Sequence, residues 1–118
     1  MNQLLKGKVA LITGSSTGIG LGILKALSAA GASTVLHGLV SQEELLTKAA
    51  AVQQATGSPV TTASADLRDP AAIRAMVAAA AAAHGGRLDI LVNNAGEGYF
   101  RYDIDRNYGA TLGGARRR

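Results

Sequence analysis

The sequence predicts a single α/β domain in which four parallel strands form a sheet with helices on both faces. Three observations lead to this fold class. Short segments rich in β-forming residues alternate with longer segments of helical periodicity, glycines and capping residues separate the two kinds, and the strand segments are almost continuously apolar. Such alternation produces right-handed crossovers between parallel strands, and continuous apolar strands are typical of a sheet covered on both sides.

The first β-α-β unit is predicted from the start of the chain. Residues 9–13 (V-A-L-I-T) predict the first strand, and a turn rich in glycine and serine follows it. Apolar residues then recur at four-residue spacing, which indicates a helix: Ile19, Ile23 and Leu27. Gly31 stands where a helix-terminating glycine is expected, and residues 33–37 (S-T-V-L-H) predict the second strand.

The second helix has a clear start, because Ser41 and Glu44 form an S-x-x-E capping box. We expect this helix to run to about Thr56, with Gly57 ending it. Residues 60–65 predict a third, weaker strand.

The third helix is predicted from Asp69 and Pro70, an N-cap followed by proline at the first helical position. One face of this helix carries the apolar residues Ile73, Met76, Val77 and Ala80. Gly85 and Gly86 end it, and residues 89–93 (D-I-L-V-N) predict the fourth strand. We expect the strand order 3-2-1-4 along the sheet.

The composition excludes several classes of function. The chain has no cysteine, which rules out disulfides, thiolate catalysis and cysteine-based metal sites, and its two histidines lie too far apart in sequence to suggest a zinc site. No segment approaches the roughly 18 apolar residues of a membrane span. Lys6 and Lys8 interrupt the N-terminus where a signal peptide would be apolar. We therefore expect a cytoplasmic protein that has no metal and does not contact a membrane.

The net charge of +4 is concentrated near the C-terminus. Residues 1–98 carry seven Lys/Arg and six Asp/Glu, which gives +1, whereas residues 99–118 carry five Arg and two Asp, which gives +3. All four aromatic residues also lie in the second segment. We expect a folded domain over residues 1–98 and a basic tail over 99–118, whose terminal arginines are solvated charge rather than a nucleic-acid contact.

A glycine-rich loop, T-G-S-S-T-G-I-G over residues 13–20, connects the first strand to the first helix. Gly14 suits a sharp turn, Gly18 lets the backbone approach a ligand, and Gly20 lets the helix pack against the strand. The helix N-terminus offers free N–H groups and a partial positive charge to a phosphate. Hydroxyl donors lie beside them: Ser15, Ser16 and Thr17. A loop in this context predicts a dinucleotide pyrophosphate site.

This loop resembles the cofactor signature T-G-x-x-x-G-I-G of the short-chain dehydrogenases/reductases. Two further segments resemble motifs of that family: Asn93-Asn94-Ala95-Gly96 after the fourth strand, and Asp66-Leu67 after the third. The resemblance covers residues 6–96 and implies the first half of a Rossmann fold that binds NAD or NADP. Within the family, the first β-α-β unit is most similar to that of the 3-hydroxybutyrate dehydrogenases.

The resemblance implies a set of cofactor-binding residues: Gly14, Ser16, Thr17, Gly18, Ile19, Gly20, Leu39, Asp66, Leu67, Asn93, Ala95 and Gly96. Two of these have a structural alternative. Asp66 could serve only to cap a turn, and Asn93 could serve only to join strands together. The crevice for the cofactor is expected at the carboxyl ends of strands one and four, where the strand order reverses.

The choice between NAD and NADP depends on the end of the second strand. An acidic residue there would hold the ribose 2′-hydroxyl of NAD, and a nearby arginine would accept the 2′-phosphate of NADP. Residues 38–40 (G-L-V) provide neither, and Ser15 is uncharged where NADP enzymes of the family often carry a cation. We therefore predict NAD. His37, which ends the second strand, is predicted to lie at the rim of the site and not to act in catalysis.

The family's catalytic serine and Tyr-x-x-x-Lys pair lie well beyond the N-N-A-G motif, and there the tyrosine acts as general acid/base. No lysine follows Lys48 in this sequence. Tyr102 and Arg106 have the right spacing, but arginine does not replace lysine at such a site, and the position is too early in the fold. We expect a truncated chain with an aberrant tail and no catalytic residue of its own.

Three interpretations of the chain stay open. It is the cofactor-binding part of an NAD-dependent oxidoreductase, an inactive nucleotide-binding module, or a non-functional fragment. In each case residues 90–92 would form an apolar sheet edge that carries no charge or proline, so we expect self-association through the fourth strand.

Overall fold

A computed structural model describes residues 3–95, and the account of the structure concerns these residues. The elements along the chain are β1 (Val9–Ile12), α1 (Gly18–Ala29), β2 (Ser33–His37), α2 (Gln42–Thr56), β3 (Val60–Ala63), α3 (Pro70–Ala82) and β4 (Ile90–Val92). The four strands form one parallel sheet in the order β3-β2-β1-β4, which confirms the predicted topology.

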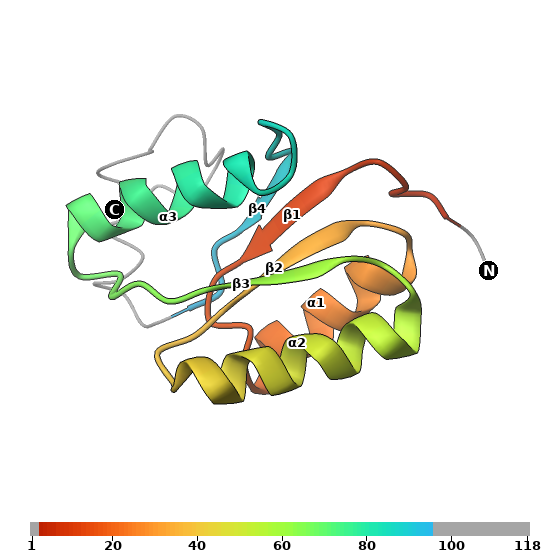
Figure 1. Cartoon of the computed structure of the whole chain (residues 1–118), viewed down its shortest axis with the longest axis horizontal. Coiled ribbons are helices and arrows are strands. Elements are labelled where there is room, and N and C mark those ends of the chain that lie inside the picture. The colour runs from red at the N-terminus through yellow and green to blue at the C-terminus, as the bar shows by residue number, and fades with distance from the viewer. Residues whose placement is uncertain (1–2, 96–118) are drawn as a thin grey trace.

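The helices cover both faces of the sheet. Figure 1 shows α1 and α2 on one face and α3 on the other. The connections from β1 to β2 and from β2 to β3 move along the sheet in one direction, whereas the connection from β3 to β4 moves back. Because each crossover is right-handed, the reversal places α3 on the opposite face.

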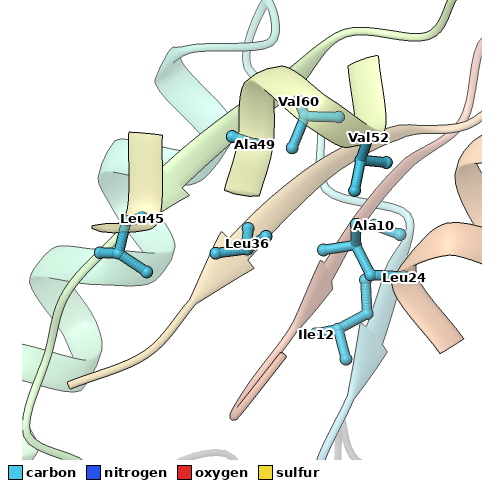
Figure 2. Close-up of a cluster of buried hydrophobic side chains, with 8 residues drawn as sticks. All are labelled: Ala10, Ile12, Leu24, Leu36, Leu45, Ala49, Val52 and Val60. Atoms are coloured by element: carbon cyan, nitrogen blue, oxygen red, sulfur yellow. The ribbon is translucent and has the colours of Figure 1, made fainter. Parts of the chain in front are cut away.

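Two hydrophobic clusters, one on each face, hold the layers together. Ile12, Leu24 and Leu36 are fully buried between the sheet and the helices α1 and α2 (Figure 2). Leu11 and Val35 point to the other face and pack with the α3 residues Ile73, Met76 and Ala80. Neighbouring residues of one strand thus enter different clusters, as the two-residue period of a strand requires. Truncating a buried leucine such as Leu24 to alanine would cost about 2–5 kcal/mol.

The end of α1 forms a complete Schellman motif. Gly31 has a φ of +104°, and its N–H donates to the carbonyl oxygen of Ser28 at 3.0 Å. The N–H of Ala32 donates to the carbonyl oxygen of Leu27 at 3.1 Å. This pattern satisfies carbonyls at the helix end and explains why a glycine stands at position 31.

The predicted starts of α2 and α3 and the predicted end of α2 are confirmed. Ser41 Oγ accepts a hydrogen bond from the N–H of Glu44 at 3.1 Å, and Gly57 ends α2 in the left-handed conformation. The carboxylate of Asp69 caps α3, in which Pro70 is the first residue. An N-cap of this kind stabilises a helix by about 1 kcal/mol.

The buried stripe of α1 is displaced by one residue from the predicted apolar spacing. The most buried residues are Gly20, Leu24 and Ser28, whereas Ile19 is 78% exposed and Ile23 is half-buried. Gly20 lies in this stripe because α1 contacts the backbone of Gly14 there, and Ser28 lies in it because its Oγ bonds Thr34 Oγ1 at 3.0 Å. The predicted strands are also one or two residues too long at β1, β3 and β4.

The β4 strand lies at one end of the sheet beside β1, with Ala10 opposite Ile90 and Ile12 opposite Val92. All three β4 residues are only half-buried. Asp89 fixes the start of the strand, because its carboxylate accepts the Val9 N–H at 2.9 Å. Within residues 3–95, no strand pairs with the outer side of β4. In the same range, no helix is long and apolar enough to cross a membrane.

Candidate functional site

The candidate site lies at the carboxyl ends of the strands, where the loop of residues 13–17 leaves β1 and enters α1. Gly14 turns the chain with a φ of +62°, and its N–H donates to Nδ1 of His37 at 2.8 Å. A Cβ atom built on Gly14 would lie 2.7 Å from the Cβ of Ala95. The turn therefore requires glycine both for its backbone conformation and for its contact with the segment after β4.

Gly18 and Gly20 have different roles from each other. Gly18 has a φ of +60°, and a Cβ atom built on it would meet nothing within 4 Å, so its surface is open. A Cβ atom on Gly20 would overlap the carbonyl oxygen of Gly14 and lie 2.5 Å from Nδ2 of Asn94. Gly20 was expected to allow contact between helix and strand; it instead allows contact with the loop and with the segment after β4.

A hydrogen-bond network joins the loop to the segment after β4. Thr13 is 1% exposed, and its Oγ1 accepts the N–H groups of Asn94 and Ala95, each at 3.0 Å. Nδ2 of Asn94 donates to the carbonyl oxygens of Thr13 at 3.2 Å and of Gly14 at 3.1 Å. Thr13 and Asn94 were not among the predicted site residues, although both lie within the two motifs that were recognised.

His37 does not lie at the rim of the site, and this prediction was wrong. The side chain is 2% exposed, and its Nε2 lies 2.9 Å from the carbonyl oxygen of Ala65. Its backbone N–H donates to Ser15 Oγ at 2.9 Å, and the Ser15 N–H donates back to the His37 carbonyl oxygen at 2.8 Å. Burial lowers the pKa of His37, and the contact with the Ala65 carbonyl opposes that shift. The residue is a buried link between β2, the loop and the end of β3.

The first turn of α1 presents unpaired donors to the open side of the loop. The N–H groups of Gly18, Ile19 and Gly20 precede the first intrahelical bond, which runs from Leu21 to Thr17 at 3.2 Å. Among the described residues, the side chain of Thr17 provides no cap for them. Thr17, Gly18 and Ile19 are exposed. The helix dipole adds a partial positive charge at the same point, so the loop can bind an anion.

Helix α2 contacts the loop through Lys48. Its Nζ donates to the carbonyl oxygen of Ser16 at 2.5 Å and lies 3.5 Å from the carboxylate of Glu44. Ser16 is itself 7% exposed, and a Cβ atom built on Gly38 would lie 2.6 Å from its Oγ. The next residue in the chain, Leu39, is 60% exposed.

The segment after β3 holds the predicted adenine-contacting pair, Asp66 and Leu67. The side chain of Leu67 is 2% exposed and packs in the cluster beneath α3, so only its backbone could touch a ligand. The carboxylate of Asp66 accepts the N–H of Arg68 at 3.0 Å and pairs with the guanidinium at 2.8 Å. Hydrogen bonds from Arg68 lower the pKa of Asp66 to about 2, and the bond from the Arg68 side chain has the largest effect. Asp66 therefore makes the turn-capping contact that was its structural alternative.

The remaining predicted residues lie after β4. Asn93 Oδ1 is buried and has no hydrogen-bond partner within the described part of the chain. Ala95 lies beside Gly14, as the loop geometry requires. Gly96, the Tyr102–Arg106 segment and the basic tail lie outside the described residues. Over residues 3–95, no group of three or more histidine or acidic side chains could hold a metal ion.

Comparison with known proteins identifies the class to which this fold and loop belong. Residues 8–107 match the short chain dehydrogenase family. The chain therefore belongs to the short-chain dehydrogenases/reductases, whose members are oxidoreductases that bind NAD or NADP.

Three relatives give the range of this likeness. The D-beta-hydroxybutyrate dehydrogenase of Cupriavidus necator is 45% identical over 93 residues, which are 79% of this chain and 35% of the relative. The L-sorbose reductase of Gluconobacter frateurii, solved with NADPH and L-sorbose, has a TM-score of 0.78 and 30% identity over 98% of this chain and 48% of its own. A metagenomic short-chain oxidoreductase in complex with NADP has a TM-score of 0.76 and 31% identity, over 92% of this chain and 57% of its own.

The chain covers only part of the length of these relatives. The chain spans about a third of the curated relative and about half of each solved chain. These matches confirm the predicted family and the predicted resemblance to hydroxybutyrate dehydrogenases.

Proposed function

We propose that residues 13–20, with the segments after β2, β3 and β4, bind the adenosine-diphosphate half of a nicotinamide dinucleotide. The observation that carries this proposal is the open first turn of α1, which has no side-chain cap and has open space beside Gly18. The network of Thr13 and Asn94 supports it, because it holds the loop rigid before a ligand arrives. A preorganised loop loses little conformational entropy on binding.

In this proposal each part of the site has one task. The N–H groups of Gly18–Gly20 and the hydroxyl of Thr17 bind the pyrophosphate. Ile19 and Leu39, both exposed and apolar, cover the adenosine ribose and its surroundings. Asp66 and the backbone of Leu67 lie beside the adenine, and Asn93, Ala95 and Gly96 border the cofactor on the β4 side. The bound cofactor would supply hydride chemistry.

NAD is the cofactor that we propose. A 2′-phosphate would carry extra negative charge to the end of β2, where Leu39 offers no cation. Lys48 is the cation that contacts the loop, but its ammonium group is already bound to the Ser16 carbonyl and to Glu44. Because two of the similar structures were solved with NADPH or NADP, the preference of this chain between NAD and NADP has to be measured. Competition between NAD and NADP for the chain should favour NAD, and tighter binding of NADP would refute the assignment.

Catalysis is proposed for the family fold as a whole and not for the residues described. No lysine follows Lys48 in the sequence, so no Tyr-x-x-x-Lys pair is present to move the substrate proton. The likeness to D-beta-hydroxybutyrate dehydrogenase makes 3-hydroxybutyrate the substrate to test. We expect no turnover of NAD with 3-hydroxybutyrate by the 118-residue chain. Activity clearly above a blank would contradict the proposal and would require a catalytic residue in the tail.

Two glycines provide a matched test of cofactor binding. Gly18 and Gly57 both have positive φ, +60° and +80°, and a Cβ atom would meet nothing within 4 Å at either position. Gly18→Ala and Gly57→Ala should therefore lose similar stability, about 1 kcal/mol each. Gly18→Ala should weaken NAD binding tenfold or more in calorimetry, whereas Gly57→Ala should not change it. Equal NAD affinity in both variants would place the pyrophosphate elsewhere.

A nucleotide-binding module without catalysis remains the second candidate. It predicts the same NAD binding and the same absence of turnover, so fusion to the C-terminal half of a relative distinguishes the two. A fusion of residues 1–95 to the C-terminal half of a hydroxybutyrate dehydrogenase should turn over substrate if this half retains the family geometry. A folded fusion that binds NAD and does not turn over would favour the module.

A further inference from the structure

The imidazole of His37 joins two backbone groups of opposite kind. The N–H of Gly14 is a donor, so Nδ1 must accept and carry no proton. The carbonyl oxygen of Ala65 is an acceptor, so Nε2 must carry the proton. The surroundings therefore fix one neutral tautomer, with hydrogen bonds of 2.8 and 2.9 Å on either side of the ring.

These two bonds connect the turn of the glycine loop to the segment after β3. The backbone of His37 is fixed at the same time by its reciprocal bonds with Ser15. The position of Gly14 thus depends on a side chain 23 residues further along the chain. If Nδ1 became protonated, two N–H groups would face each other, and the Gly14 amide would lose its acceptor in a partly buried environment.

We propose that His37 is a positioning residue for the dinucleotide. In its neutral form, protonated at Nε2, it holds the Gly14 turn in the conformation that presents the first turn of α1 to the pyrophosphate, and protonation of Nδ1 releases that turn. The inference rests on the proposed function, because it concerns the affinity of the same loop for NAD.

Among the ionisable groups near the ring, His37 is the one expected to titrate near neutral pH. Residues 9–24 and 90–95 contain no ionisable side chain. The ionisable side chains on α2, in the segment after β3 and on α3 are Glu43, Glu44, Lys48, Asp66, Arg68, Asp69 and Arg74. Histidine is the only one of these residue types whose ordinary pKa lies between 5 and 8. Burial lowers the pKa of His37 from its ordinary value of 6.5, so the neutral form prevails at pH 6.5 and above and is lost only at a lower pH.

Substitutions separate the hydrogen bond from the titration. The Oδ1 atom of an asparagine at position 37 can occupy the place of Nδ1 and accept from Gly14, but it does not titrate. A phenylalanine keeps the ring shape and offers no acceptor. His84 provides the control, because its Nε2 lies 3.0 Å from Thr61 Oγ1 near the start of β3, at the edge of the sheet opposite the loop.

The experiment is calorimetry of NAD with the 118-residue chain from pH 8 to pH 5, with circular dichroism to confirm folding at each pH. The pyrophosphate of NAD does not titrate in this range. We expect wild type and His84→Asn to bind equally well at pH 8 and to lose affinity about tenfold towards pH 5. His37→Asn should bind with an affinity independent of pH, and His37→Phe should bind about tenfold more weakly at pH 8.

The outcomes separate the two claims. If wild type does not bind NAD at any pH, the proposed function fails. If wild type binds and His37→Asn shows the same pH dependence, the positioning role of His37 is refuted. Imidazole ¹⁵N spectra of the folded chain give an independent readout, with a protonated Nε2 and an unprotonated Nδ1 expected at pH 8. The opposite tautomer would also overturn the inference.

Discussion

Gly20 and Asn94 approach so closely that a Cβ atom on Gly20 would lie 2.5 Å from the Nδ2 atom of Asn94. The two residues belong to different motifs, one at the start of α1 and one after β4. Their contact joins the two motifs into one surface, because Asn94 also binds the carbonyl oxygens of Thr13 and Gly14. The glycine loop and the N-N-A-G segment therefore act as one structural unit.

The first prediction concerns this contact. Gly20→Ala should destabilise the fold by about 1–3 kcal/mol, because the new methyl group meets backbone that cannot move aside. Gly22→Ala is the control on the same helix, since a Cβ atom there meets nothing within 4 Å. It should leave stability unchanged or raise it by about 0.5–1 kcal/mol. Thermal unfolding of both variants checks the prediction, and equal melting temperatures would contradict the packing described.

The second prediction concerns Thr13. Thr13→Val keeps the side-chain shape but removes Oγ1, so the N–H of Ala95 loses its acceptor, and the N–H of Asn94 keeps only its bond to the Val92 carbonyl oxygen. The unpaired Ala95 N–H costs about 1–3 kcal/mol. Thr34→Val is matched, because Thr34 is also buried and its Oγ1 has one partner, Ser28 Oγ, at 3.0 Å. Both variants should lose stability in denaturant titrations, but only Thr13→Val should weaken NAD binding. A similar loss of NAD affinity in Thr34→Val would attribute the effect to general destabilisation.

Local patterns predicted most of the fold, because the signals that start and end helices act within a few residues. Ser41, Gly57 and Asp69 each determine a helix end through bonds to residues at most four positions away. The alternation of β1 and β2 residues between two clusters followed from apolar strands covered on both faces. The three motifs of the family likewise identified the edge of the sheet that carries the site.

The interior of the site could not be predicted in the same way. The contact of His37 with Gly14 spans 23 residues, and the contacts of Thr13 with Asn94 and Ala95 span 81 and 82. Such pairs depend on the register of neighbouring strands, which no local pattern determines. A polar residue that ends a strand looks the same in sequence whether it faces solvent or the neighbouring loop, so the sequence alone does not distinguish a rim position from a buried position for His37.

The third prediction concerns acid stability. The pKa of Asp66 is lowered from 3.8 to about 2 by its hydrogen bonds with Arg68, so the unfolded chain binds more protons than the folded one in this interval. The stability that Asp66 contributes is therefore complete above pH 3.8 and lost as the pH falls towards 2. The effect is small because the pair is exposed. The melting temperatures of wild type and Asp66→Asn should converge between pH 5 and pH 2. A gap that stays constant would contradict the role of the ion pair.

The fourth prediction concerns the edge formed by β4. We expect the chain to self-associate through this half-buried strand, and Leu91→Lys should reduce the association because it places a charge on the edge. Leu46→Lys is the control, since Leu46 is 53% exposed on α2 and far from the edge in the fold. Light scattering should show smaller species for Leu91→Lys alone, with circular dichroism confirming that both variants fold. A monomeric wild-type chain at high concentration would refute the prediction.

The most direct test of the account compares two ligands on the same chain. ADP-ribose contains the adenosine-diphosphate half of NAD and lacks the nicotinamide, for which the described residues provide few partners. Calorimetry of the 118-residue chain should therefore give similar, weak affinities for ADP-ribose and NAD, and Gly18→Ala should weaken both tenfold or more. A hundredfold preference for NAD, about 2.7 kcal/mol, would contradict the account, because the nicotinamide half would then have a binding site in this chain.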